Sequence, residues 1–283
     1  MSTGRAPVQA TDPRRTGAEL VSAAIQRAVD SGRPAIAAFL TAGFPSREAF
    51  PGLLAATAAE ADLVEVGVPF SDPMADGLTI QRSSRAALLD GTTLPWILDT
   101  LAGISRSDEE GNASRTRTAP VLLMSYLNPI MAHGFERFAD DAAKAGVSGL
   151  IVPDLPLEEC DELRAALDRK GIALVQLVTP ATPPGRLELV CQASRGFVYA
   201  VTMKGTTGAS VDPGSIGQYL GRVRNAAPLP VLAGFGVRSA SDVAGLGRFA
   251  DGVIVGSALV EAIERGSDPG VFVRELRGEE VAS

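Results

Sequence analysis

The sequence has little histidine and cysteine, and it has no long apolar run. His133 is the only histidine, and Cys160 and Cys191 are the only cysteines, with no CxxC spacing. A His/Cys metal cage is excluded by so few ligands. A serine triad would have to use His133, which we expect to be a solvated loop residue. No apolar run approaches the ~18 residues that a membrane span needs.

Charge and targeting signals narrow the class of protein further. The 26 Lys and Arg residues against 33 Asp and Glu give a net charge of −7. This balance argues against a nucleic-acid partner or an anionic membrane surface. No apolar segment follows the N-terminal arginines, so no secretory signal is predicted and we expect a reducing cytoplasm. Residues 1–16 predict a flexible arm, and residues 17–283 a single domain.

Short apolar runs alternate with helical patterns along the chain. Eight runs are nearly continuous in Val, Ile, Leu and Ala, which is typical of strands buried on both faces; they are Ala35–Thr41, Ala61–Val66, Val121–Tyr126, Gly149–Val152, Ala173–Val178, Phe197–Thr202, Pro230–Ala233 and Gly252–Val255. The alternation predicts a closed α/β (β/α)8 barrel, the TIM fold. An open dinucleotide-binding sheet is disfavoured, since no GxGxxG follows the first run.

The segments between these runs carry helical spacing. Gly17–Ser31 has its apolar residues on one face and predicts an extra helix that closes the barrel bottom. Further helices are predicted at Arg47–Glu60, Phe135–Ala145, Leu157–Lys170, Pro184–Ala193, Ser215–Asn225 and Ala240–Gly247. The polar stretch Ser105–Pro120 predicts a loop on the face away from the chemistry.

Chemistry in such a barrel lies at the carboxyl ends of the strands. Glu65 interrupts an apolar run, where burial would raise its pKa and suit it to acid–base work. Asp76 follows eleven residues later in a loop rich in Pro and Gly. Two carboxylates in different surroundings can divide the roles of acid and base. The alternative is an internal ion pair for Glu65 and a turn-capping role for Asp76.

Two later strand ends predict a phosphate site. The seventh run ends in Gly234-Phe235-Gly236, with Ser239 before a helix, and the eighth ends in Gly256-Ser257 at a helix start. Small residues let backbone N–H groups approach a phosphate, and a helix N-terminus favours its charge. Neither loop contains lysine, so binding would depend mostly on the main chain. The alternative is glycine serving left-handed turns.

The remaining candidates each have two interpretations. The small-residue loop 202–212 predicts a mobile lid in which Thr207 meets a carboxylate, or else a plain solvated loop. Tyr126 and Tyr199 hydrogen-bond a reacting group or pack in the core. Asp154 orients substrate or caps the helix that follows it.

Together these segments resemble the tryptophan synthase α subunit family, from about Pro34 to Val260. The most specific stretch is Glu65–Gln81, EVGVPFSDPMADGLTIQ. Six shorter segments support the resemblance in the same order, namely FLTAG at 39–43, MSYLNP at 124–129, IVPDLP at 151–156, GTTG at 205–208, GFG at 234–236 and GS at 256–257. Leu78 departs from the proline of many members, and Met203-Lys204 departs in the lid.

The resemblance implies retro-aldol cleavage of indole-3-glycerol phosphate to indole and glyceraldehyde 3-phosphate. It gives Glu65 the acid–base role and Asp76 the hydrogen bond to the indole nitrogen. It places Phe39, Met124, Ile151 and Phe235 around the indole ring and Tyr126 and Tyr199 in the pocket. It gives Thr207 the place of the lid threonine that meets Asp76, and it places Gly208, Gly236, Gly256 and Ser257 at the phosphate.

The resemblance also implies a partner. The family needs no metal or cofactor in this chain, and it passes indole to a pyridoxal-phosphate β subunit for L-tryptophan synthesis in an α₂β₂ tetramer. The alternatives are a stand-alone lyase that releases free indole, a different phosphate-binding barrel enzyme, or a non-catalytic barrel kept as a docking surface. The last is disfavoured because both carboxylates are present.

Overall fold

A computed structural model describes residues 15–109, 119–202, 213–234 and 236–279. In that part of the chain, parallel strands pair in sequence order and β8 pairs with β1, which closes the barrel. The strands are β1 (Ala35–Thr41), β2 (Leu63–Gly67), β3 (Val121–Met124), β4 (Val147–Ile151), β5 (Ala173–Val178), β6 (Val198–Val201), β7 (Val231–Gly234) and β8 (Gly252–Val255). The predicted (β/α)8 barrel is confirmed.

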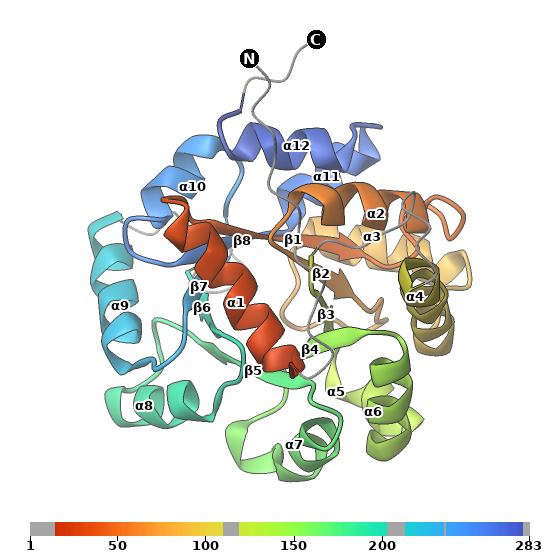
Figure 1. The fold of residues 1–283 in the computed structure, drawn as a ribbon, viewed down its shortest axis with the longest axis horizontal. Helices are drawn as coiled ribbons and strands as arrows, with labels where there is room; N and C mark the ends of the chain where they lie inside the picture. Colours follow the sequence, from red (N-terminus) through yellow and green to blue (C-terminus); the bar gives the residue numbers. More distant parts are fainter. Residues whose placement is uncertain (1–14, 110–118, 203–212, 235, 280–283) are drawn as a thin grey trace.

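Helices surround the strands in a ring, except for α1, which lies across one end of the barrel (Figure 1). They are α1 (Gly17–Asp30), α2 (Phe50–Glu60), α3 (Leu78–Leu89), α4 (Leu94–Glu109), α5 (Leu127–His133), α6 (Phe135–Lys144), α7 (Asp161–Asp168), α8 (Pro184–Ala193), α9 (Pro213–Ala226), α10 (Ala240–Leu246), α11 (Ser257–Glu264) and α12 (Pro269–Leu276), with a 3₁₀ turn at Leu157–Glu159.

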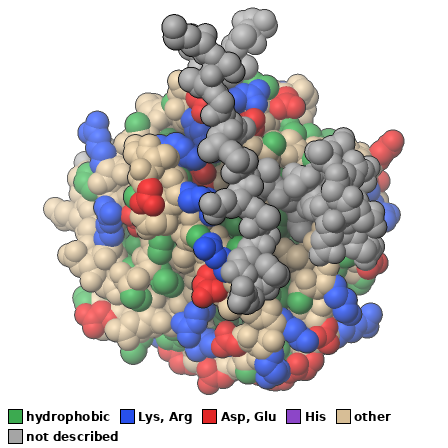
Figure 2. All heavy atoms as spheres, viewed as in Figure 1, with side chains coloured by type: hydrophobic (Ala, Val, Ile, Leu, Met, Phe, Trp, Pro, Cys, Tyr) green, Lys and Arg blue, Asp and Glu red, His purple; other side chains and the backbone are tan. Residues whose placement is uncertain are grey.

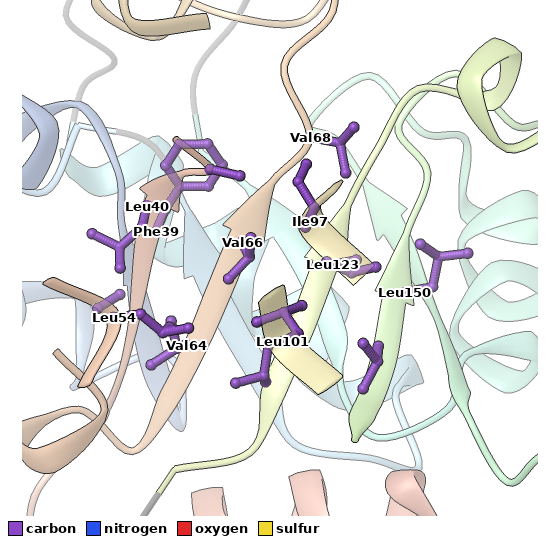
Figure 3. Packing of buried hydrophobic residues seen from close by; sticks show 14 of the residues in the cluster. Phe39, Leu40, Leu54, Val64, Val66, Val68, Ile97, Leu101, Leu123 and Leu150 are labelled. Atoms are coloured by element: carbon purple, nitrogen blue, oxygen red, sulfur yellow. The ribbon is translucent and has the colours of Figure 1, made fainter. Parts of the chain in front are cut away.

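The strands are buried on both faces, as their continuous apolar runs require. Alternate residues of a strand point outward, and Val64 and Val66 of β2 lie beneath Leu54 of α2 and Leu101 of α4 (Figure 3). The inward-pointing residues form a separate cluster inside the barrel that includes Leu63, Leu122, Ile151, Val175, Phe197, Tyr199, Leu232 and Ile254. The two clusters hold the strand ends in fixed positions, so side chains there are placed by the whole barrel.

Helix α1 lies across one end of the barrel (Figure 1). Thr16 begins it with a capping box, in which its hydroxyl accepts from the Glu19 amide and its own amide donates to the Glu19 carboxylate. Val21 and Ile25 are fully buried and belong to the interior cluster. The predicted bottom-closing helix is confirmed, and the carboxyl ends of the strands therefore lie at the opposite end of the barrel.

The face over α1 carries charges of both signs (Figure 2). Just after α7, Lys170 pairs with Asp140 of α6 at 2.5 Å, and Arg169 pairs with Glu136 of α6. Within the described residues, no helix is long and apolar enough to cross a membrane.

Three predictions about local structure are wrong in part. His133 is not a solvated loop residue: it ends α5, its side chain is 7% exposed, and Nε2 lies 3.0 Å from Asp141 Oδ2. The predicted helix from Leu157 is interrupted at Cys160, where a 3₁₀ turn gives way to α7. The predicted loop from Ser105 begins late, because α4 continues to Glu109.

Candidate active site

Glu65 lies in the middle of β2 and points into the barrel. It is in register with Phe39 of β1 and Leu122 of β3, and it is 2% exposed. Burial raises the pKa of its carboxyl to about 8, and the nearby charge of Asp76 adds to the rise. No Lys or Arg of the described chain forms an ion pair with it, so the alternative of an internal ion pair is not supported there. Glu65 is protonated at neutral pH.

Asp76 lies at the end of the loop between β2 and α3, and it is partly buried. Burial raises the pKa of its carboxyl to about 6, against the effect of a hydrogen bond donated by the Tyr126 hydroxyl. That hydroxyl accepts from the Ala75 amide at 2.8 Å. Asp76 is therefore ionised at neutral pH while Glu65 keeps its proton, and the two carboxyl groups take opposite states at the same mouth.

The backbone of this loop is held from two sides. Gln81 Nε2, one turn into α3, donates to the Asp76 carbonyl at 2.9 Å. Phe70 stacks on Tyr126, with ring centroids 5.1 Å apart. Leu78, where the resemblance expects proline in many members, is the first residue of α3 and is 80% exposed. Both contacts of the loop form with leucine at this position.

Two aromatic rings fit the mouth because glycine faces each of them. A Cβ at Gly67 would lie 2.3 Å from the Phe39 ring, and a Cβ at Gly234 would lie 2.5 Å from the Tyr199 ring. Tyr199 is 4% exposed. Burial raises the pKa of its hydroxyl well above the usual value, and the charges of Glu65 and Asp76 raise it further. Tyr199 thus packs in the core, with Glu65 and Asp76 near enough to act on its hydroxyl, and its hydrogen bond to a reacting group stays a prediction.

Met124 and Ile151 end neighbouring strands and pair with each other in register. Both belong to the interior cluster or pack against it. Asp154 follows β4, and its Oδ1 accepts from the Leu127 amide at 2.9 Å, in the first turn of α5. The capping interpretation therefore named the wrong helix: Asp154 accepts from the first residue of α5, and no side chain caps the 3₁₀ turn or α7 that follow it.

The predicted phosphate loops lie at the ends of β7 and β8. Gly236 has φ +83°, a left-handed conformation that favours glycine. Ser239 caps α10, its hydroxyl accepting from the Asp242 amide. Gly256 precedes α11 with no side-chain hydrogen bond at the cap, so the Ser257 end of this helix presents main-chain N–H groups.

Arg238 is a basic residue in the loop after β7 that the sequence analysis did not single out, because it noted only the absence of lysine there. Its guanidinium pairs with Glu261 of α11 at 2.5 Å. A search of each strand-end loop for both basic residue types would have found it.

Some predicted site residues lie outside the described part of the chain, namely Thr207, Gly208, Phe235 and the lid departures Met203 and Lys204. Among described residues, no three or more His, Cys, Asp or Glu side chains form a group that could hold a metal. The described residues bring together a protonated and an ionised carboxyl group near the aromatic rings of Phe39, Tyr126 and Tyr199.

Comparison with known proteins agrees with this geometry. The sequence profile described as "Tryptophan synthase alpha chain" matches residues 25–278. The chain is 46% identical to the tryptophan synthase alpha chain of Xanthomonas oryzae pv. oryzae, over 84% of this chain and 87% of that one. It is 45% identical to that of Nitratidesulfovibrio vulgaris, over 88% and 95%.

Solved structures give the same result. The fold is similar to Mycobacterium tuberculosis tryptophan synthase, with a TM-score of 0.82 and 35% identity, over 93% of this chain and 98% of that one. It is also similar to tryptophan synthase subunit alpha of Legionella pneumophila, with a TM-score of 0.80 and 30% identity, over 91% and 97%. The chain belongs to the tryptophan synthase alpha chain family.

Proposed function

We propose that Glu65 and Asp76 carry out the retro-aldol cleavage of indole-3-glycerol phosphate, the lyase reaction of the family. The observation that carries this assignment is the difference between the two carboxyl groups. The pKa of Glu65 is raised to about 8 and that of Asp76 to about 6. Near pH 7 the site therefore holds one proton donor and one anionic acceptor.

The reaction balances with these two groups alone. Glu65 gives its proton to the indole carbon that bears the glycerol chain, which puts positive charge toward the ring nitrogen. Asp76 accepts a hydrogen bond from the ring N–H and stabilises that charge. Glu65, now ionised, takes the proton of the side-chain hydroxyl as the carbon–carbon bond breaks. The bonding electrons return to the ring, and Glu65 is protonated again.

The surrounding side chains support this placement of the substrate. Phe39, Met124 and Ile151 are apolar side chains toward the carboxyl ends of β1, β3 and β4, a lining that suits an indole ring. The backbone at Gly236, Gly256 and Ser257 suits the phosphate. Thr207, Gly208 and Phe235 remain candidates from the resemblance, as does Asp154 as a substrate contact.

The family sets the wider role of the chain. Its members work with a β subunit in an α₂β₂ complex, and pyridoxal phosphate belongs to the β subunit. We therefore assign this chain the release of indole for L-tryptophan synthesis. We also propose a cytoplasmic location and a single domain over residues 17–283.

Two substitutions test the division of roles. Glu65→Gln keeps the shape of the side chain and removes its proton transfer, so indole formation should fall at least ~10²-fold. Asp76→Asn removes the anion at the ring nitrogen and should lower kcat more than it changes KM. Indole release is measured with indole-3-glycerol phosphate as substrate, with circular dichroism to verify folding.

Asp161→Asn is the matched control. Asp161 is a carboxylate on α7 with its side chain 91% exposed, and its loss should leave turnover at the wild-type level. Near-normal turnover by folded Glu65→Gln would refute the acid–base assignment. No turnover by the wild-type chain, with or without a β subunit, would refute the function itself and favour another phosphate-binding barrel enzyme.

A further inference from the structure

One carboxylate, Glu261 of α11, joins three elements at the open end of the barrel. Its Oε1 accepts from the Thr79 hydroxyl on α3 at 3.0 Å. Its Oε2 accepts from Arg238 Nη2, in the loop between β7 and α10, at 2.5 Å. Both oxygens are used, and each contact reaches a different part of the proposed site.

The three residues lie close in sequence to the groups that would contact substrate. Thr79 comes three residues after Asp76, in the first turn of α3. Arg238 comes two residues after Gly236. Glu261 comes four residues after Ser257, about one turn along the same face of α11. The network therefore runs from the phosphate loops to the loop that carries Asp76.

The charges of this network suit a response to phosphate. The Glu261 side chain is 23% exposed. Burial acts to raise its pKa, but the hydrogen bonds from Thr79 and Arg238 lower it overall, so the carboxylate is ionised at neutral pH. A phosphate dianion at the start of α11 attracts the Arg238 guanidinium and repels the Glu261 carboxylate. Either effect shifts the Glu261 carboxylate, which accepts the hydrogen bond of the Thr79 hydroxyl.

We propose that Glu261 is a positioning residue that couples the phosphate subsite to the Asp76 loop. Binding of the substrate phosphate at Gly236 and Ser257 then favours the placement of Asp76 that accepts the indole N–H. The inference rests on the proposed function, because it takes both ends of the network from that reaction. It adds a role for Glu261, Thr79 and Arg238 that the reaction steps themselves do not require.

A second contact, an ion pair, joins the same two helices and serves as a control. Arg82, one turn along α3 from Thr79, forms a bidentate pair with Glu264 of α11 through Nε at 2.9 Å and Nη2 at 2.6 Å. This pair joins α3 to α11 without reaching the loop after β7. A contact that only holds the helices together would behave like Arg82–Glu264.

The experiment compares Thr79→Val, Thr79→Ser and Arg82→Gln in the full chain. Thr79→Val removes the hydroxyl at constant shape, so kcat should fall at least fivefold while the affinity for glycerol 3-phosphate changes less than twofold. The acid limb of the pH profile, which reports Asp76, should also shift. Thr79→Ser keeps the hydroxyl and should restore kcat. Arg82→Gln should match the wild type in all three readouts.

A double substitution tests the route through Glu261. Arg238→Gln should also lower kcat, and adding Thr79→Val should lower it no further, because the two changes break one path. Wild-type kcat in Thr79→Val, an equal loss in Arg82→Gln, or additive losses in the double variant would each overturn the inference while leaving the proposed function intact. Absence of wild-type turnover would overturn both.

Discussion

At the scale of single residues, the surroundings of Glu65 and Asp76 set their protonation. Glu65 lies on a barrel strand and points into the barrel, where burial is the larger cause of its raised pKa. Asp76 is on a loop, where the Tyr126 hydroxyl offsets part of the effect of burial. The order of the two pKa values follows from these positions. It gives a window of pH in which Glu65 is an acid and Asp76 an anion.

Turnover should therefore have a bell-shaped dependence on pH. kcat/KM should fall below about pH 6 as Asp76 takes up a proton, and above about pH 8 as Glu65 loses one. In Asp76→Asn the alkaline limb of the residual activity should move to lower pH, because the Asp76 charge helps to raise the pKa of Glu65. Initial rates of indole release from pH 5 to 9 give both limbs. A residual activity whose alkaline limb stays in place would contradict the coupling.

At the scale of elements, the sequence predicts strands better than it predicts helix interiors. The runs Ala35–Thr41, Ala173–Val178 and Gly252–Val255 match β1, β5 and β8, because a strand buried on both faces is nearly continuous in apolar residues. The predicted helix from Leu157 fails at Cys160, where nothing in the periodicity marks a break. The segment begins with a 3₁₀ turn directly after Pro156, whose backbone is extended.

Functional candidates also differ in how far the sequence predicts their surroundings. Glu65 was predictable from one charge inside an apolar run, since such a charge has few structural reasons. His133 and Asp154 were not, because each is paired with a residue of another element: His133 with Asp141 of α6, and Asp154 with the Leu127 amide. Those contacts depend on how helices pack against the barrel. No pattern along the chain records that packing.

Glycines in the strands leave room for aromatic rings at the barrel mouth, and a substitution of Gly234 tests this role. A Cβ there would lie 2.5 Å from the buried Tyr199 ring, so Gly234→Ala should push that ring from the mouth. We expect at least a tenfold loss of kcat/KM and a loss of about 1–3 kcal/mol in the free energy of unfolding.

Gly221→Ala is the matched control for this change. Gly221 lies within α9, and a Cβ there meets nothing within 4 Å. That variant should keep full activity and gain up to about 1 kcal/mol in urea unfolding, because alanine favours helix. Full activity in Gly234→Ala would show that Tyr199 can move without cost to the reaction.

At the scale of the whole molecule, the two ends of the barrel differ. α1 closes one end with apolar side chains, whereas the loop of Asp76 at the other end exposes large apolar residues. Met74 is 75% exposed and Leu78 is 80% exposed. Exposed apolar side chains that gather at one place mark a candidate surface for a protein partner. The family's β subunit is the partner that this end is expected to meet.

The lyase activity of the isolated chain should accordingly be low, and its own β subunit should raise it at least tenfold. A partner that covers Met74 and Leu78 holds the loop in one conformation, so binding energy favours the placement of Asp76 that reacts.

Met74→Gln removes apolar contact area and leaves Glu65 and Asp76 unchanged. It should keep the basal rate and weaken the stimulation. Lyase assays with and without the β subunit, with sedimentation of the mixture, measure both. High activity alone, with no complex and no stimulation, would instead identify a stand-alone lyase that releases free indole.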